Sequence, residues 1–173
     1  MTLNLIFTRK VFLSICLTVC VWAIAIATIL TIDINPSYAE DFDKQILAGA
    51  DFSGKSLVGS QFNKTDLHNS NFRNANLTGV SLFGANMTAA DFTGADMRYS
   101  TLDTARMNGA NLTNALLEGA FTYGTSFVGA TIAGADFTDV DLRNTTRTLL
   151  CKLATGTNPT TGRVTKETLE CEE

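Results

Sequence analysis

The sequence predicts a solenoid, a fold built by stacking one short repeated unit on the next. Three observations carry this prediction. A large apolar residue recurs every five residues from Phe42 to Leu142, a small residue precedes it by two positions from Ala75 onward, and Asp or Asn often lies between them. A helix repeats every ~3.6 residues and a strand every two, so a period of five belongs to neither. A period this regular indicates a repeat architecture, in which each unit buries its apolar side only against its neighbours.

The five-residue frame holds over 21 consecutive positions, and only Thr122 among them is not a large apolar residue. From Ala75 to Val140, the residue two positions earlier is small or at most valine. The apolar positions, called centres below, are Phe42, Leu47, Phe52, Leu57, Phe62, Leu67, Phe72, Leu77, Leu82, Met87, Phe92, Met97, Leu102, Met107, Leu112, Leu117, Thr122, Phe127, Ile132, Phe137 and Leu142.

Segments such as Ala75-Asn76-Leu77-Thr78-Gly79 and Ala110-Asn111-Leu112-Thr113 resemble pentapeptide repeats, which read Ala-(Asp/Asn)-Leu followed by two variable residues. The resemblance covers residues 40–145. It implies an all-β fold, a right-handed quadrilateral β-helix in which each pentapeptide forms one side and four form one coil. Residues twenty positions apart should then stack on one another.

The centres support this stacking, because like residues recur at twenty-residue intervals, as in the column Phe52, Phe72 and Phe92. With coils ~4.8 Å apart, about five coils would form a rod on the order of 25 Å long. We expect the centre and the small residue before it to point inward, because so tight a coil has no room for two large residues per side. Each buried centre should contribute roughly 1.5–3 kcal/mol.

Residues 1–39 read as a secretory signal peptide. Arg9 and Lys10 precede an uncharged run from Val11 to Ile32, and Ser37-Tyr38-Ala39 provides small residues before a cleavage site after Ala39. The alternative is a retained anchor, since such a run is long enough to span a bilayer. The segment around Arg9 resembles a twin-arginine signal, but Lys10 replaces the second arginine, which favours the general export route.

Residues 146–173 predict a short helical cap over the last coil, because the end of a solenoid leaves apolar centres and backbone groups uncovered. We expect one helix over 146–154, a turn over 158–162, and a second helix from Lys166 to about Cys171 with Thr165 as its N-cap. Cys151 and Cys171 are the only cysteines beyond the predicted signal peptide. An exported protein favours a disulfide between them, either as a structural staple or as a redox-switched pair.

Four aromatic residues, Phe83, Tyr99, Phe121 and Tyr123, should face solvent on one side of the solenoid or at its preceding corner. Thr122, the one centre that is not apolar, lies between two of them. One interpretation is a local distortion, with an aromatic side chain turning inward to fill the space at Thr122. The other is a docking patch for a partner protein, because grouped exposed aromatics often mark interfaces.

The sequence shows no catalytic constellation and predicts no cofactor. His68 is the only histidine, and we expect it to be solvated. One outward column alternates carboxylates with amides, as in Asp51, Asn71 and Asp91, so its charges lie too far apart to converge on a metal ion. The net charge of −4 and the absence of any basic cluster argue against nucleic-acid binding.

The chain resembles exported pentapeptide-repeat proteins of cyanobacteria and of thylakoid lumens. This resemblance implies a non-enzymatic structural or protein-interaction module in the thylakoid lumen or periplasm. We expect a monomer with an unidentified protein partner and no stable membrane insertion after signal removal. The alternative is a DNA-mimicking topoisomerase (gyrase) inhibitor, a role that some members of the family have. That role calls for a long acidic rod in the cytosol, whereas this rod is short and carries an export signal.

Overall fold

A computed structural model describes residues 39–172 of the chain. The predicted signal peptide, apart from Ala39, lies outside the described residues, and so does the choice between its removal and its retention as an anchor. Among residues 39–172, no helix is long and apolar enough to cross a membrane.

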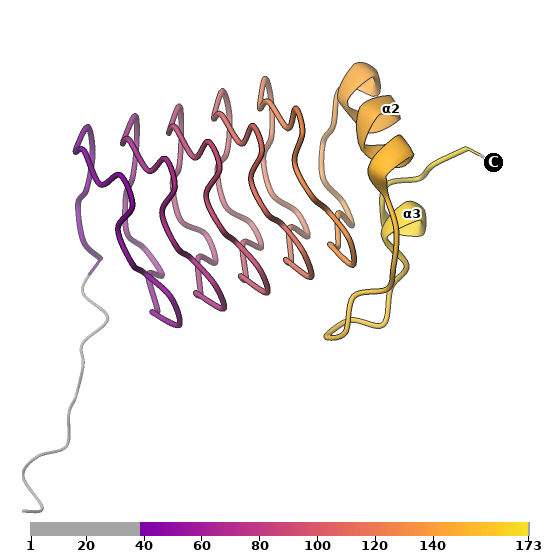
Figure 1. The fold of residues 1–173 in the computed structure, drawn as a ribbon, viewed down its shortest axis with the longest axis horizontal. Helices are drawn as coiled ribbons and strands as arrows, with labels where there is room; N and C mark the ends of the chain where they lie inside the picture. The colour runs from indigo at the N-terminus through magenta and orange to yellow at the C-terminus, as the bar shows by residue number, and fades with distance from the viewer. Residues whose placement is uncertain (1–38, 173) are drawn as a thin grey trace, which may run out of the picture. The chain divides into compact units, whose positions relative to one another are not determined.

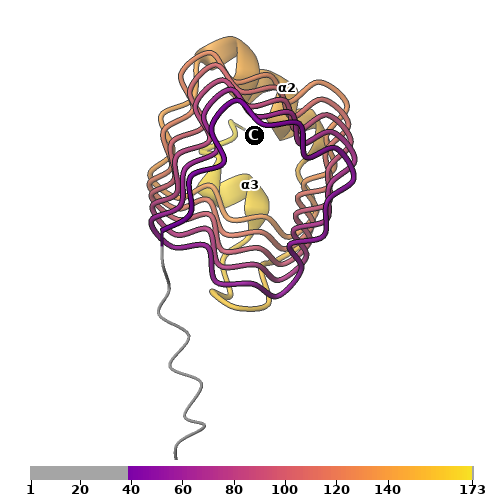
Figure 2. The ribbon, with the colours of Figure 1, turned by 90° about the vertical axis from the view of Figure 1, so that its left-hand side faces the viewer.

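Residues 41–140 form five coils of twenty residues that stack on one another (Figure 1). Each side of a coil contributes one bridging residue, which pairs in parallel with the residue twenty positions later, as Asp41 does with Gln61 and Asp51 with Asn71. Within the described residues, sixteen such parallel bridges run from coil to coil. Viewed along the stack, the outlines of successive coils nearly superimpose (Figure 2). The predicted twenty-residue register is therefore confirmed.

The corners of the coils are tight turns with a left-handed residue. The third residue of each turn has a positive φ at twenty consecutive five-residue intervals from Lys44 to Asp139, and eleven of these residues are glycine. The backbone N–H of the fourth residue donates to the carbonyl of the centre, for example from Ala95 to Phe92 at 2.9 Å. A positive φ at that third position defines a type II turn. Each pentapeptide therefore turns the chain once.

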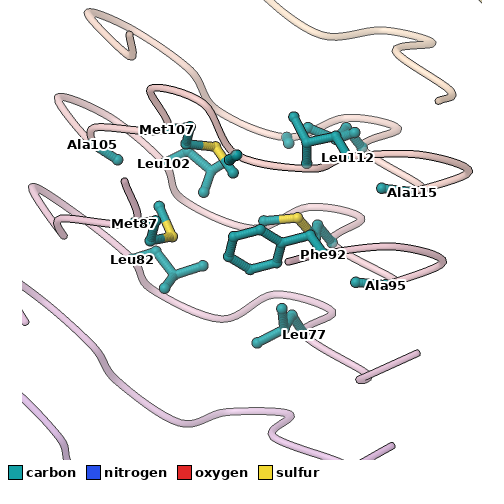
Figure 3. Close-up of a cluster of buried hydrophobic side chains, with 14 of the residues drawn as sticks. Leu77, Leu82, Met87, Phe92, Ala95, Leu102, Ala105, Met107, Leu112 and Ala115 are labelled. Atoms are coloured by element: carbon teal, nitrogen blue, oxygen red, sulfur yellow. The ribbon is translucent and has the colours of Figure 1, made fainter. Parts of the chain in front are cut away.

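The core is a set of side-chain stacks that run along the solenoid. Phe52, Phe72 and Phe92 lie face to face, with successive ring centroids 4.9 Å apart. Centres and small residues from neighbouring coils, such as Phe92 and Ala95 of one coil and Leu112 and Ala115 of the next, point into the same interior (Figure 3). Both kinds of residue are buried throughout the middle coils. The predicted inward frame is confirmed.

Two helices follow the last coil within the described residues: α2 (Asn144–Leu153) and α3 (Thr165–Thr168). Leu150, Ala154 and Leu169 are buried in the same core cluster as the centres. Between the helices, Thr157 and Val164 form an antiparallel bridge, so that residues 158–162 turn as the sequence predicted. Both helices lie at the C-terminal end of the stack (Figure 1).

The segment that joins α2 and α3 is also bonded to the coils. Asn158 is buried, and its side-chain amide donates to the carbonyl of Gly134 at 2.8 Å. The N–H of Gly134 donates to the carbonyl of Thr155, also at 2.8 Å. The hydroxyl of Thr168 accepts a bond from the N–H of Phe137. These contacts satisfy backbone groups that the last coil would otherwise leave without a sheet partner.

Cys151 and Cys171 form a disulfide, with their Cα atoms 5.7 Å apart. The predicted role of Thr165 as an N-cap is wrong. Val164 is the N-cap residue of α3, and no side-chain hydrogen bond caps the helix. Thr165 is instead the first helical residue, and its N–H donates to the carbonyl of Gly156 at 3.1 Å. The helix also ends at Thr168, three residues earlier than expected.

Candidate interaction wall

The candidate site is one side of the solenoid, called the aromatic wall below and defined by Phe83, Tyr99, Phe121, Tyr123, Asp103 and Arg143. The exposed fractions of its four aromatic residues are 41%, 56%, 57% and 64%, in sequence order. Phe83 and Tyr123 follow the centres Leu82 and Thr122, and therefore point away from the core. The four predicted aromatic residues are thus all exposed, although their role in docking stays a prediction.

Thr122 explains why the wall keeps its aromatic residues outside. Its side chain is buried, and its hydroxyl donates to the carbonyl of Asp141 at 2.8 Å. Neither Phe121 nor Tyr123 turns inward, so the interpretation of Thr122 as a gap filled by an aromatic ring is wrong. The regular coils end at residue 140 and α2 begins at Asn144, and the threonine hydroxyl bonds to a carbonyl of the short segment between them.

Tyr99 reaches the wall from a corner with a positive φ of 58°. Its ring lies over Gly119 of the next coil, where an added Cβ would come within 2.7 Å of the ring carbons. The absence of a side chain at Gly119 therefore leaves room for the Tyr99 ring to lie along the surface. A non-glycine residue in this conformation is uncommon, and local packing must stabilise it.

Two neighbouring coils are tied together beneath Tyr123. The N–H of Tyr123 donates to a carboxylate oxygen of Asp103 at 2.7 Å. The guanidinium carbon of Arg143 lies 4.4 Å from the centroid of the Tyr123 ring, within cation–π range. The wall therefore combines apolar rings with one carboxylate and one cation at fixed positions.

The other sides of the solenoid carry Asp and Asn residues whose side chains stabilise turns. The side-chain oxygen of Asp91 accepts the N–H of Thr93 at 2.9 Å, and that of Asn76 accepts the N–H of Thr78 at 3.1 Å. This is the Asx-turn geometry. Asn86 also donates along the stack to Asp66 at 2.9 Å. The sequence analysis did not assign this role in turns. The signal was present, because Asp or Asn often stands immediately before the centre, which is the first residue of the turn.

Several acidic side chains on these sides pair with a basic residue. Asp91 pairs with Arg73 at 2.9 Å and Asp96 with Arg98 at 2.6 Å. Burial raises the pKa of the Asp96 carboxyl, but hydrogen bonds and the charge of Arg98 outweigh burial and hold its pKa below the ordinary value. His68 was expected to be solvated, yet its Nδ1 lies 2.9 Å from an Asp66 carboxylate oxygen. That pair is exposed and local.

Asp136 is the one buried carboxylate in the solenoid, and it binds the C-terminal segment. The guanidinium of Arg163 lies 3.2 Å from Asp136 and 2.9 Å from Glu118. Burial raises the pKa of Asp136, but hydrogen bonds from Thr138 and the charge of Arg163 more than compensate and lower its pKa. Among the described residues, no group of three or more His, Cys, Asp or Glu could hold a metal ion.

The comparisons with known proteins agree with the repeat frame. A family described as pentapeptide repeats (8 copies) matches residues 41–74, 70–109 and 105–144. The chain therefore belongs to the pentapeptide repeat family. The fold that the family's solved structures imply for it is the right-handed quadrilateral β-helix.

Two solved structures are similar to this chain in sequence as well as in fold. A pentapeptide repeat protein from the thylakoid lumen of Arabidopsis thaliana is 47% identical, with a TM-score of 0.75, and the match covers 76% of this chain and 92% of that one. A pentapeptide repeat protein from the cyanobacterium Nostoc is 33% identical, with a TM-score of 0.50, and the match covers 53% and 83%. No similar sequence was found among curated proteins.

A third solved structure is a plasmid-mediated fluoroquinolone resistance protein, which is 23% identical to this chain. Its TM-score is 0.37, and the match covers 64% of this chain and 71% of that one. This likeness carries no argument about function.

Proposed function

We propose that the chain is a non-enzymatic protein-interaction module of an extracytoplasmic compartment, and that the aromatic wall is the surface that binds its partner. The compartment is the thylakoid lumen or the periplasm. The observation that carries the proposal is the group of four exposed aromatic residues on one side of the solenoid, whereas the exposed apolar residues of the other sides, Ile46, Val58 and Val128, are aliphatic. Aromatic residues are enriched in protein interfaces, because a large ring buries much apolar area when a partner covers it.

The similarity to a thylakoid lumen protein of Arabidopsis supports the proposed compartment. The predicted signal peptide and the disulfide between Cys151 and Cys171 agree with it, since disulfides persist in oxidising compartments. We propose that the signal is removed after Ala39, so that the exported protein begins at Glu40. Mass spectrometry of the natively processed protein should give that N-terminus, and recovery of a full-length, membrane-embedded species would contradict it.

The rigidity of the solenoid supports an interaction role. The backbone under the wall is bonded from coil to coil, for example from Leu82 N–H to the Thr101 carbonyl at 2.8 Å and from Leu102 N–H to the Phe121 carbonyl at 2.7 Å. A partner would therefore meet side chains that a fixed backbone carries. Such preorganisation lowers the entropy that is lost on binding.

DNA mimicry receives no support from the charges on the walls. A mimic needs a regular, free row of negative charges, whereas Asp91, Asp96 and Asp136 are each paired with an arginine. The rows along the stack also alternate acidic and neutral residues, as in Asp51, Asn71 and Asp91. We therefore favour a protein partner.

Capture of partners from the native compartment tests the proposal. The bait carries Tyr99→Asn, Phe121→Ser and Tyr123→Ser, and asparagine at position 99 suits the positive φ there. The matched control is Val128→Ser, because Val128 is 62% exposed but lies on the adjoining side. We expect a partner to be retained by the wild type and by the control and lost with the triple variant, at unchanged thermal stability. Retention by the triple variant would exclude the wall as the binding surface.

A further inference from the structure

The aromatic wall contains a column in which two rings flank a carboxylate. Phe83, Asp103 and Tyr123 occupy the same position of three successive coils, and Arg143 follows in the same register. Coils are spaced by ~4.8 Å, so the backbone positions that carry the two rings lie about 9.6 Å apart along the stack. Both rings are exposed and the aspartate between them is shorter than either, and the space above Asp103 between Phe83 and Tyr123 is called the slot below.

Arg143 shows how a cation packs against this column. Its guanidinium carbon lies 4.4 Å from the centroid of Tyr123. Because Arg143 comes from the C-terminal side of Tyr123, the opposite face of that ring is turned toward Asp103 and Phe83. If another guanidinium carbon lay at this same distance from each of the two rings, the ring centroids would be about 8.8 Å apart, which is twice the distance between Arg143 and Tyr123. That separation is close to the spacing of two coils.

The carboxylate in the slot has capacity to accept further hydrogen bonds. One oxygen of Asp103 accepts the N–H of Tyr123 at 2.7 Å, and within residues 39–172 the other oxygen has no hydrogen-bond partner. Asp43 occupies the same column three coils earlier, but there both oxygens accept bonds from Asn63, at 2.7 and 3.1 Å. Asp103 is therefore the carboxylate of this column that remains available to an incoming donor.

We propose that the slot formed by Phe83, Asp103 and Tyr123 binds an arginine side chain of the partner protein. The inference deepens the proposed function, on which it rests, by naming the chemistry that the partner presents. A planar guanidinium can stack between two rings while it donates to a carboxylate below, which an ammonium group cannot do as well. The negative charge of Asp103 complements the cation, and Arg143 already fills the other face of Tyr123.

A capped Gly-Arg-Gly peptide is the probe, and NMR titration of the isotope-labelled exported protein is the measurement. We expect saturable shifts of the Asp103 and Tyr123 amide signals. The same peptide with citrulline, which keeps the planar shape but lacks the charge, should bind more weakly by about fivefold, the ratio expected from one exposed ion pair. Equal binding of the two peptides would overturn the inference, and so would concentration-dependent shifts without peptide, which would make a second copy the occupant.

Asp103→Asn and Asp43→Asn form a matched pair of variants, because both aspartates lie in one column but only Asp103 lies between two rings. We expect Asp103→Asn to weaken peptide binding by about fivefold and Asp43→Asn to leave it unchanged. An equal effect of both variants would show general electrostatic attraction and overturn the slot. If the native partner is still lost with the triple variant while the peptide does not bind to the wild type, the arginine assignment is wrong and the proposed function survives.

Discussion

At the scale of single residues, the direction of a side chain follows from its place in the five-residue frame. Phe92 is buried between Phe72 and Leu112, whereas Thr93 lies at the surface and hydrogen-bonds to Asp91 and Asn111. We expect Phe92→Asp to unfold the protein, because a buried charge without a partner is very costly. Thr93→Asp should cost only ~1–2 kcal/mol through its lost hydrogen bonds. Thermal denaturation checks the pair, and equal melting temperatures would refute the frame.

Thr104 should be a source of strain that one substitution relieves. Its φ is 59°, a left-handed value that is unfavourable for a β-branched residue, and its side chain is exposed. Asparagine tolerates this conformation and occupies the equivalent position at Asn69. We expect Thr104→Asn to stabilise the fold by up to ~1 kcal/mol and the reverse swap, Asn69→Thr, to destabilise it by a similar amount. Denaturant unfolding measures both, and changes of the same sign in the two variants would contradict the explanation.

The frame could be predicted from the sequence because burial selects residue types at a fixed spacing, as at Phe52, Phe72 and Phe92. The partners of polar groups could not. Pairing of His68 with Asp66, and the bond from Thr122 to the Asp141 carbonyl, depend on side-chain rotation and on where the coil ends. Neither leaves a periodic signal. The aromatic wall was predictable as a set of outward residues, but the free oxygen of Asp103 was not.

At the scale of elements, the C-terminal segment is held by contacts that lie far apart in the sequence. Arg163 contacts Glu118 and Asp136, and Asn158 reaches the carbonyls of Asn114 and Gly134. Cys151 and Cys171 were predictable as a pair because no other cysteines follow the apolar N-terminal run. The burial of the Asn158 side chain against the coils was not predictable, because the same Asn-Pro pair also occurs in turns that lie at the protein surface.

The link between Asp136 and Arg163 should make part of the stability sensitive to acid. Because the folded-state pKa of Asp136 is lowered, its contribution is present above the ordinary pKa of 3.8 and is lost as the pH falls through the folded-state value. We expect Asp136→Asn to lower the free energy of unfolding by ~1–3 kcal/mol at pH 7, with a smaller difference from the wild type below pH ~4. Denaturation at several pH values tests this, and a difference that stays constant down to pH ~3 would contradict it.

The disulfide should stabilise α3 more than the coils. α3 has only four residues, too few to be stable alone, and Cys171 lies three residues beyond its last residue, Thr168. The bond closes a loop with a sequence separation of 20, which should contribute ~3 kcal/mol. On reduction we expect the amide of Leu169 to lose its protection from hydrogen exchange, while that of Leu112 keeps it. Loss of both together would identify the C-terminal segment as the folding nucleus, and loss of neither would show that the bond has no stabilising role.

At the scale of the described solenoid, stability should vary along the stack because each coil depends on its neighbours. The middle centres, such as Leu67 and Met87, are fully buried, and the C-terminal end is covered by α2 and α3. In the first coil, Leu47 is only partly buried and Ile46 is 81% exposed. In a one-dimensional stack, an end with fewer contacts opens first.

Hydrogen exchange of the exported protein should therefore show a gradient. The amide of Leu47, which donates to the Asp66 carbonyl at 2.7 Å, should exchange faster than that of Met87, which donates to the Arg106 carbonyl at 2.8 Å. The bond lengths are alike, so the difference must come from the cost of opening each coil. Consistently, Met87→Ala should cost ~2–5 kcal/mol and Leu47→Ala clearly less, because the partly buried side chain leaves a smaller cavity. Equal protection and equal costs at both sites would mean that the five coils open as one cooperative unit rather than from the N-terminal end.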